Sequence, residues 1–148
     1  MYEHLLVPVE DSDLSGRAIE ASIGLAKLLG AKVTGFTVER PLPPMVLDQV
    51  IMGYDPDTIT THQMQCESHA RDVLQRFAER ARDAGVPFEG QFSVTDNVQE
   101  AIVEAAQRHG CDLIVMATHG RHGLDALISG SLTKSVLSHS QVALLVVH

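Results

Sequence analysis

Two kinds of segment alternate along the chain: short, mostly aliphatic runs, and longer stretches in which apolar residues recur at helical spacing. The short runs predict β-strands, and three of them hold almost no polar residue, which is typical of strands that helices cover on both faces. The five expected strands are His4 to Val9, Lys32 to Val38, Phe88 to Val94, Leu113 to Ala117 and Val142 to Val147. This alternation predicts an α/β fold.

The longer stretches predict four helices. The first runs from Ser12 to Leu29, with Asp11 or Ser12 as its N-cap and Gly30 after its end. Its apolar stripe consists of Leu14, Ala18, Ala21, Leu25 and Leu28, and that of the second helix consists of Cys66, Ala70, Val73, Leu74, Phe77 and Ala81. A third helix begins at Asn97, which has capping-box spacing to Glu100, and runs to Gly110 with the apolar residues Ala101, Ile102, Ala105 and Ala106. A fourth runs from about Ser131 to Ser138.

Residues 40 to 61 break this rhythm, because prolines and a glycine are scattered among apolar residues there. We expect a long excursion after the second strand, with one short helix in it. Two interpretations remain open. The segment is either a surface loop that packs its own apolar residues or a lid or partner-binding flap.

The whole chain, residues 1 to 148, is expected to form one domain, since this length leaves no room for a second core. We expect a five-stranded, doubly wound parallel sheet of order 3-2-1-4-5 with helices on both faces, which is a Rossmann-like fold. Ligands of such sheets bind beyond the carboxyl ends of the strands at the switch point, here between the first and fourth strands. The sequence places Pro8 to Ser12 and Ala117 to Gly120 at those ends.

The charge balance limits the classes of partner that the chain can bind. The sequence has 11 Lys and Arg residues and 19 Asp and Glu residues, so its formal net charge is −8. An acidic chain without a cluster of cations is not expected to hold nucleic acid. Neither a signal peptide nor a membrane span of about 20 apolar residues is found, and Cys66 and Cys111 fit small buried hydrophobes, so a cytoplasmic location without membrane contact is expected. One small anion remains compatible, since backbone N–H groups can hold a phosphate without cationic side chains.

A glycine-rich segment after the fourth strand offers such groups. Gly120 and Gly130 bracket a spacer of nine residues, and Gly120 and Gly123 allow tight backbone that turns N–H groups toward one point. Gly130 and Ser131 are expected to open the fourth helix, whose free N–H groups and positive dipole end would meet a phosphate. Turn geometry and capping would explain the same residues, so the spacing alone leaves both interpretations open.

Three segments of the chain carry a longer pattern. Ala117-x-x-Gly120 followed by nine residues and Gly130-Ser131 resembles the Gly-x-x-Gly, nine residues, Gly-Ser or Gly-Thr nucleotide signature of the universal stress protein family. Leu5 to Ser12 and Val142 to Val147 resemble that family's first and last strands, so the resemblance covers the whole chain. The chain departs from the family at Ala117, where a glycine is usual, and at Glu10, where an aspartate is usual.

The resemblance implies an adenine-nucleotide-binding, regulatory stress-response module that takes ATP or AMP, with Mg²⁺ compatible with ATP. It places the nucleoside against Pro8, Val9, Glu10 and Val38, the ribose and α-phosphate against Met116, Ala117, His119 and Gly120, and the outer phosphates against Gly130, Ser131, Leu132 and Thr133. Arg121 and Gly123, in the loop between these groups, complete the candidate set. The resemblance also favours a homodimer that pairs through Val142 to Val147, an apolar strand that would otherwise lie open at a sheet edge.

Two alternatives stay open beside this hypothesis. One is a homodimeric interaction protein of the same fold that binds no nucleotide, and the other is a slow ATPase with Glu10 or Asp11 as base. No catalytic residue is assigned, because the spacing forces no general base. No metal site is assigned either, because His119 and His122 lack a third ligand.

Overall fold

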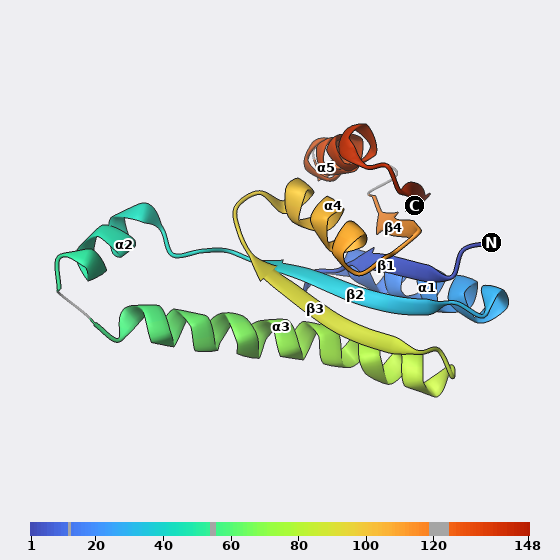
Figure 1. Ribbon diagram of the computed structural model, residues 1–148, viewed down its shortest axis with the longest axis horizontal. Helices are drawn as coiled ribbons and strands as arrows, with labels where there is room; N and C mark the ends of the chain where they lie inside the picture. Colours follow the sequence, from blue (N-terminus) through green and yellow to red (C-terminus); the bar gives the residue numbers. More distant parts are fainter. Residues whose placement is uncertain (12, 54–55, 119–124) are drawn as a thin grey trace.

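The computed structural model describes residues 1–11, 13–53, 56–118 and 125–148. A parallel five-stranded sheet lies between two layers of helices (Figure 1). Its strands are β1 (His4–Pro8), β2 (Lys32–Glu39), β3 (Phe88–Val94), β4 (Leu113–Ala117) and β5 (Ala143–Val147). The order β3-β2-β1-β4-β5 confirms the predicted doubly wound, Rossmann-like sheet.

Five helices are present in the described chain: α1 (Asp13–Leu29), α2 (Pro44–Ile51), α3 (Thr58–Asp83), α4 (Val98–Arg108) and α5 (Asp125–His139). Side chains alternate along the strands, so Leu5 and Val7 face α1 and α3, whereas Leu6 faces α4 and α5. The two resulting cores cover both faces of β1, which is why this strand is almost free of polar residues.

The buried stripes of α3 and α4 are those that helical periodicity predicts. In α3 the buried residues are Cys66, Ala70, Val73, Leu74, Phe77 and Ala81, and in α4 they are Ala101, Ile102, Ala105 and Ala106. Phe77 stacks at a tilt on Phe88 of β3, with ring centroids 4.7 Å apart. Both cysteines are free and buried, as predicted, and burial raises the pKa of Cys111 to about 11.

The predicted stripe of α1 is partly wrong. Leu28 is 87% exposed, whereas Ala18, Ser22 and Ala26 are buried. The Ser22 hydroxyl donates a hydrogen bond to the carbonyl oxygen of Ile19 (2.8 Å), so a polar residue is accommodated on the buried face. The core-facing side of α1 is therefore rotated relative to the stripe that apolar residues alone suggest.

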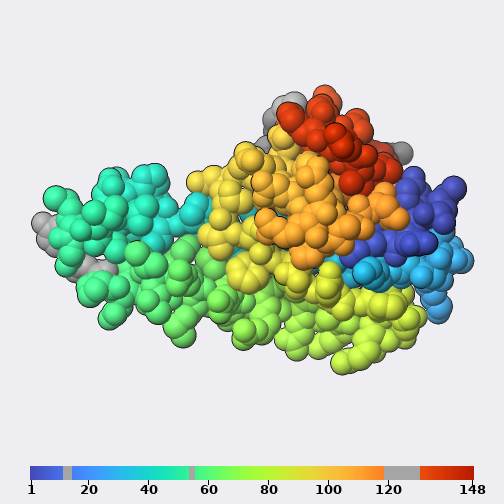
Figure 2. All heavy atoms as spheres, in the orientation of Figure 1, coloured from blue at the N-terminus to red at the C-terminus, as the bar shows by residue number. Residues whose placement is uncertain are grey.

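The excursion after β2 contains the expected short helix, α2, but it ends earlier than expected because α3 already begins at Thr58. We call α2 and the start of α3, residues 44–53 and 56–65, the arm. The arm extends beyond the sheet at one end of the molecule (Figures 1 and 2). The interpretation as a loop that packs its own apolar residues is wrong, since Met45, Ile51 and Met52 are 74%, 74% and 75% exposed.

No helix in the described ranges is long and apolar enough to cross a membrane.

Candidate functional site

A cleft of about 720 Å³ opens at the carboxyl edge of the sheet. It lies at the switch point, where β1 pairs with β2 on one side and β4 on the other. The strand ends and α1 contribute Pro8, Val9, Glu10, Ser15, Ala18, Phe36, Val38, Arg40, Met116 and Ala117 to its lining. The turn into α4, α4 itself and α5 contribute Thr95, Asp96, Asn97, Val98, Gln99, Ile102, Ser131, Leu132 and Ser135.

The first wall of the cleft is formed where β1 runs into α1. The Val9 amide donates to the Phe36 carbonyl (2.8 Å), so the chain stays against β2 for one residue beyond β1. The Glu10 amide then donates to the Ser15 hydroxyl (2.8 Å), which bends the chain toward α1. Val9 is buried and Glu10 exposed, so this wall presents an apolar base and an acidic rim.

A second wall is the turn between β3 and α4. The Thr95 amide donates to the Glu39 carbonyl (2.9 Å), and the Asn97 amide donates to the Thr95 hydroxyl (3.1 Å). Asn97 caps α4 as predicted, because its side-chain oxygen accepts from the Glu100 amide (3.3 Å). The N-terminal end of α4, with its positive dipole, therefore faces the cleft.

The end of β4 forms the floor, where Met116 is 5% exposed and Ala117 is half-buried. The Thr118 amide donates to the Val147 carbonyl (2.8 Å), which ties this end to β5. Among the described residues, positive φ angles occur only at glycines, so Ala117 takes an extended conformation that alanine accepts without strain. The departure from the family's first glycine is thus compatible with the strand end.

Arg40 is the one Lys or Arg among the described residues that line the cleft, and the same lining includes the acidic residues Glu10 and Asp96. Its carbonyl oxygen accepts a hydrogen bond from Nε2 of His62 on α3 (3.0 Å). Nearby, His69 contacts the Glu39 carboxylate (2.7 Å), and this hydrogen bond raises the pKa of His69. The end of β2 is thereby held to α3 beside the cleft.

The structure brings most of the predicted site residues together. Pro8, Val9, Glu10, Val38, Met116, Ala117, Ser131 and Leu132 all line this one cleft, whereas Thr133 does not. His119, Gly120, Arg121 and Gly123 lie outside the described residues. The cleft residues of the turn into α4 were not predicted, although the carboxyl end of β3 lies at the same sheet edge and could have indicated them.

The predicted start of the last helix is wrong. The helix α5 begins at Asp125, so Gly130 and Ser131 lie within it rather than at its first turn. Amides inside an α-helix donate to carbonyls four residues back and are not available to a ligand. Donation from these two amides to a phosphate therefore requires the start of α5 to unwind.

Taken together, the sheet order and the cleft define a doubly wound α/β protein whose cleft lies at the switch point, where sheets of this kind bind their ligands. The sequence profile described as the universal stress protein family matches residues 1–148, and the chain belongs to that family. It is 26% identical over 148 residues to the universal stress protein YxiE of Bacillus subtilis, covering 99% of each chain.

Solved structures share the fold. The structure of hypothetical protein MJ0577, from Methanocaldococcus jannaschii, has a TM-score of 0.78 at 22% identity over 99% of this chain and 96% of that one. A universal stress protein in complex with cAMP has a TM-score of 0.70 at 24% identity over 99% and 97%. A family member from Arabidopsis thaliana with AMP bound has a TM-score of 0.67 at 15% identity over 98% and 90%.

Proposed function

We propose that this chain binds an adenine nucleotide, ATP or AMP, in the cleft at the switch point and acts as a regulatory module of the stress response. The observation that carries the proposal is the convergence of predicted nucleotide-site residues from β1, β2, β4 and α5 on one cleft. Its volume of about 720 Å³ falls within the roughly 300–1,000 Å³ of small-molecule sites. The complexes of relatives with cAMP and AMP support the choice of an adenine nucleotide.

The lining fits the parts of a nucleotide. Val9, Val38 and Ile102 offer apolar surface for a purine ring. The end of β4, at Met116 and Ala117, offers a surface against which the ribose would lie. Ser131 and Arg40 supply a hydroxyl and a cation for phosphates. In this proposal Gly130 and Thr133 join the phosphate end only when the start of α5 unwinds. A Mg²⁺ ion would accompany ATP rather than the protein alone, since no group of three or more candidate ligand side chains gathers among the described residues.

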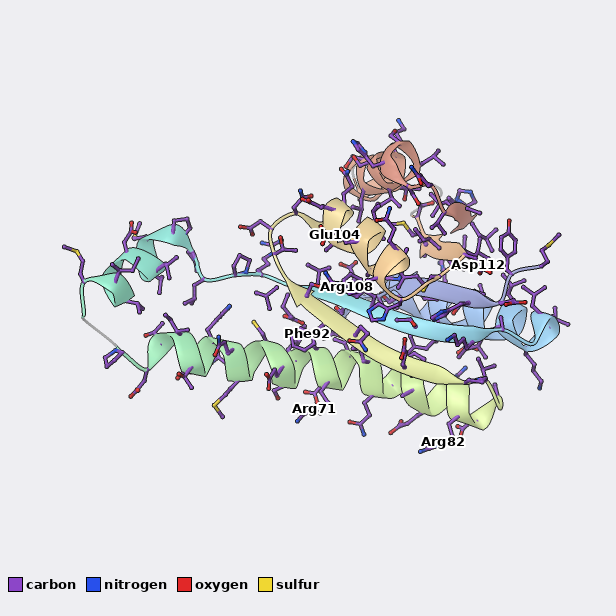
Figure 3. All side chains as sticks on the ribbon, in the orientation of Figure 1. Arg71, Arg82, Phe92, Glu104, Arg108 and Asp112 are labelled. Atoms are coloured by element: carbon purple, nitrogen blue, oxygen red, sulfur yellow. The ribbon has the colours of Figure 1, made fainter. Side chains whose placement is uncertain are left out.

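The proposal is tested by calorimetric titration of the intact protein with ATP, AMP and adenosine. We expect Arg40→Glu to weaken ATP binding about tenfold and adenosine binding much less, because the variant reverses the one described cation in the cleft. The matched control is Arg71→Glu, which makes the same change on an exposed residue of α3 that points away from the sheet (Figure 3).

Three outcomes would count against the proposal. Absence of heat with all three ligands, together with no nucleotide in mass spectra of the purified protein, would favour the interaction protein that binds no nucleotide. Equal losses in Arg40→Glu and Arg71→Glu would place the nucleotide elsewhere. Release of phosphate from ATP and Mg²⁺ that stops in Glu10→Gln would favour the slow ATPase instead.

We also propose that two copies pair through β5. This strand ends the sheet, so one of its edges meets no other strand of the described chain. Its residues are half-buried or exposed, and Leu145 is 39% exposed. Exposed apolar edge strands of soluble proteins are normally covered, and antiparallel pairing with a two-fold mate would cover this one.

A further inference from the structure

The arm carries an apolar helix, α2, that has almost no packing partner in the described chain. Only Asp48 and Gln49 are polar among the eight residues of α2, yet none of the eight is buried. No other described helix or strand lies against α2 over more than a marginal contact. A helix that is apolar nearly all round is ordinarily buried, and one so short is marginal in water without a packing partner.

The exposed apolar surface continues from α2 into the start of α3. Exposed fractions are 74% for Met45, 40% for Leu47, 74% for Ile51, 75% for Met52, 39% for Ile59 and 66% for Met64. Three of these six residues are methionines, whose flexible, polarisable side chains suit surfaces that adapt to a partner helix. Exposed apolar side chains concentrated in one part of a molecule mark an interaction site.

The charges around this surface have one sign. The sequence holds no Lys or Arg between Arg40 and Arg71, whereas Asp48, Asp57 and Glu67 are exposed there. The Asp48 carboxylate makes no hydrogen bond or ion pair with any described residue, although it stands in the middle of α2. The arm and the residues just after it therefore combine exposed apolar side chains with acidic residues and no Lys or Arg.

We propose that the arm docks a basic amphipathic helix of a protein partner. The apolar face of the partner helix would cover Leu47, Ile51 and their neighbours, and its Lys or Arg side chains would meet Asp48 and Glu67. Helix-in-groove recognition uses this combination of apolar anchors and complementary charge. The net charge of −8 on the whole chain adds long-range attraction for such a partner.

The same charges argue against other occupants. A second copy of the chain would bring two acidic arms together without a cation on either. A bilayer surface is usually anionic and is bound by helices rich in Lys and Arg, which the arm lacks. The proposal does not depend on nucleotide binding, and its test is done without nucleotide.

The test measures binding of a fluorescent synthetic peptide to the intact protein by anisotropy. The probe is an amphipathic helix of leucine on one face and lysine on the other, and its matched control replaces every lysine by glutamate. We expect the lysine peptide to bind, with an affinity that falls as salt is added, and the glutamate peptide to bind at least about tenfold more weakly.

Variants locate the contact. Ile51→Ser should weaken binding of the lysine peptide about tenfold, because it removes a large anchor, whereas Leu28→Ser, on an 87% exposed residue of α1, should not. Asp48→Lys should weaken it about threefold or more, and Asp83→Lys, at the far end of α3, should not. None of these side chains is buried, so thermal unfolding should stay unchanged in all four variants.

The proposal is overturned if neither peptide binds, if both bind equally, or if the control variants weaken binding as much as Ile51→Ser does. If the protein self-associates, and Ile51→Ser abolishes this association while a β5 variant does not, the occupant of the arm is a second copy of the chain. If the protein binds phosphatidylcholine–phosphatidylserine vesicles and Ile51→Ser abolishes that binding, the occupant is a lipid surface.

Discussion

His4, at the start of the central strand, is a buried histidine in a chain of hydrogen bonds. Its Nε2 lies 2.7 Å from the Thr34 hydroxyl oxygen, and the Thr34 hydroxyl donates to the Glu89 carboxylate (3.0 Å). Because the single hydroxyl proton of Thr34 goes to Glu89, His4 must donate through Nε2, which the neutral ring can do. Burial, and then the charge of Lys32, lower the pKa of His4.

This shift gives folding a pH dependence. The unfolded chain takes up a proton at His4 near pH 6.5, whereas the folded chain takes it up only at lower pH, so the free energy of unfolding falls as the pH drops below about 6.5. His69 changes the free energy of unfolding in the opposite direction, because its pKa is raised in the folded protein. It adds stability below about pH 6.5, and this stability is lost as the pH rises through the pKa of His69 in the folded protein.

We therefore expect His4→Gln to lose less stability than the parent protein between about pH 7.5 and about pH 5.5, and His69→Gln to lose more. Urea unfolding midpoints at the two pH values measure both effects. If the parent and His4→Gln lose the same stability, His4 is not the group that titrates.

At the scale of elements, α3 approaches the sheet closely because Gly35 of β2 has no side chain. A Cβ atom there would lie 2.7 Å from Cζ of Phe88 and 2.9 Å from Cδ1 of Phe77. Both rings are part of the core, so neither can move without disturbing the packing of α3 on β2 and β3. The absence of a side chain at Gly35 therefore determines how closely α3 packs on the sheet.

Gly35→Ala should lower the free energy of unfolding by about 1–3 kcal/mol through overpacking. The matched control is Gly24→Ala in α1, where an added Cβ would meet nothing within 4 Å. That substitution should raise stability by about 0.5–1 kcal/mol, since alanine is the better helix former. Chemical denaturation measures both changes, and a neutral Gly35→Ala would show that the rings yield freely.

Helical periodicity predicted the buried stripe of a helix correctly where that stripe is entirely apolar. Periodicity located the stripes of α3 and α4, but it failed on α1, where buried Ser22 looks like a surface residue. It also failed at the start of α5, because Gly130 and Ser131 resemble a helix start. A helix start at Asp125 is favoured because an acidic residue stabilises the positive N-terminal end of a helix and because Ala126 and Leu127 are strong helix formers.

The site was predictable in the same uneven way. The strand-end residues Val9 and Ala117 follow from the switch-point rule alone. Arg40 did not follow, because its place in the cleft depends on the path of the chain as it leaves the end of β2. No periodic pattern encodes that path.

At the scale of the whole molecule, the proposed pairing through β5 predicts a dimer. Leu145→Lys should shift the protein from twice the monomer mass to the monomer mass in sedimentation equilibrium, since it places a charge on the exposed edge strand. Leu137→Lys, on a 63% exposed residue of α5, is the control and should remain dimeric. A parent protein that is monomeric at every concentration would contradict the pairing.

The sheet order also determines when each edge of β1 can pair during translation. The central strand β1 is the first to leave the ribosome, and β2 can pair with one of its edges soon afterwards. Its other edge must wait for β4, and the hydrogen bond from the Glu3 amide to Asp112 beside this pairing spans 109 residues. A nascent chain therefore carries an open apolar edge through most of its translation, and this edge is exposed to aggregation until β4 has been made.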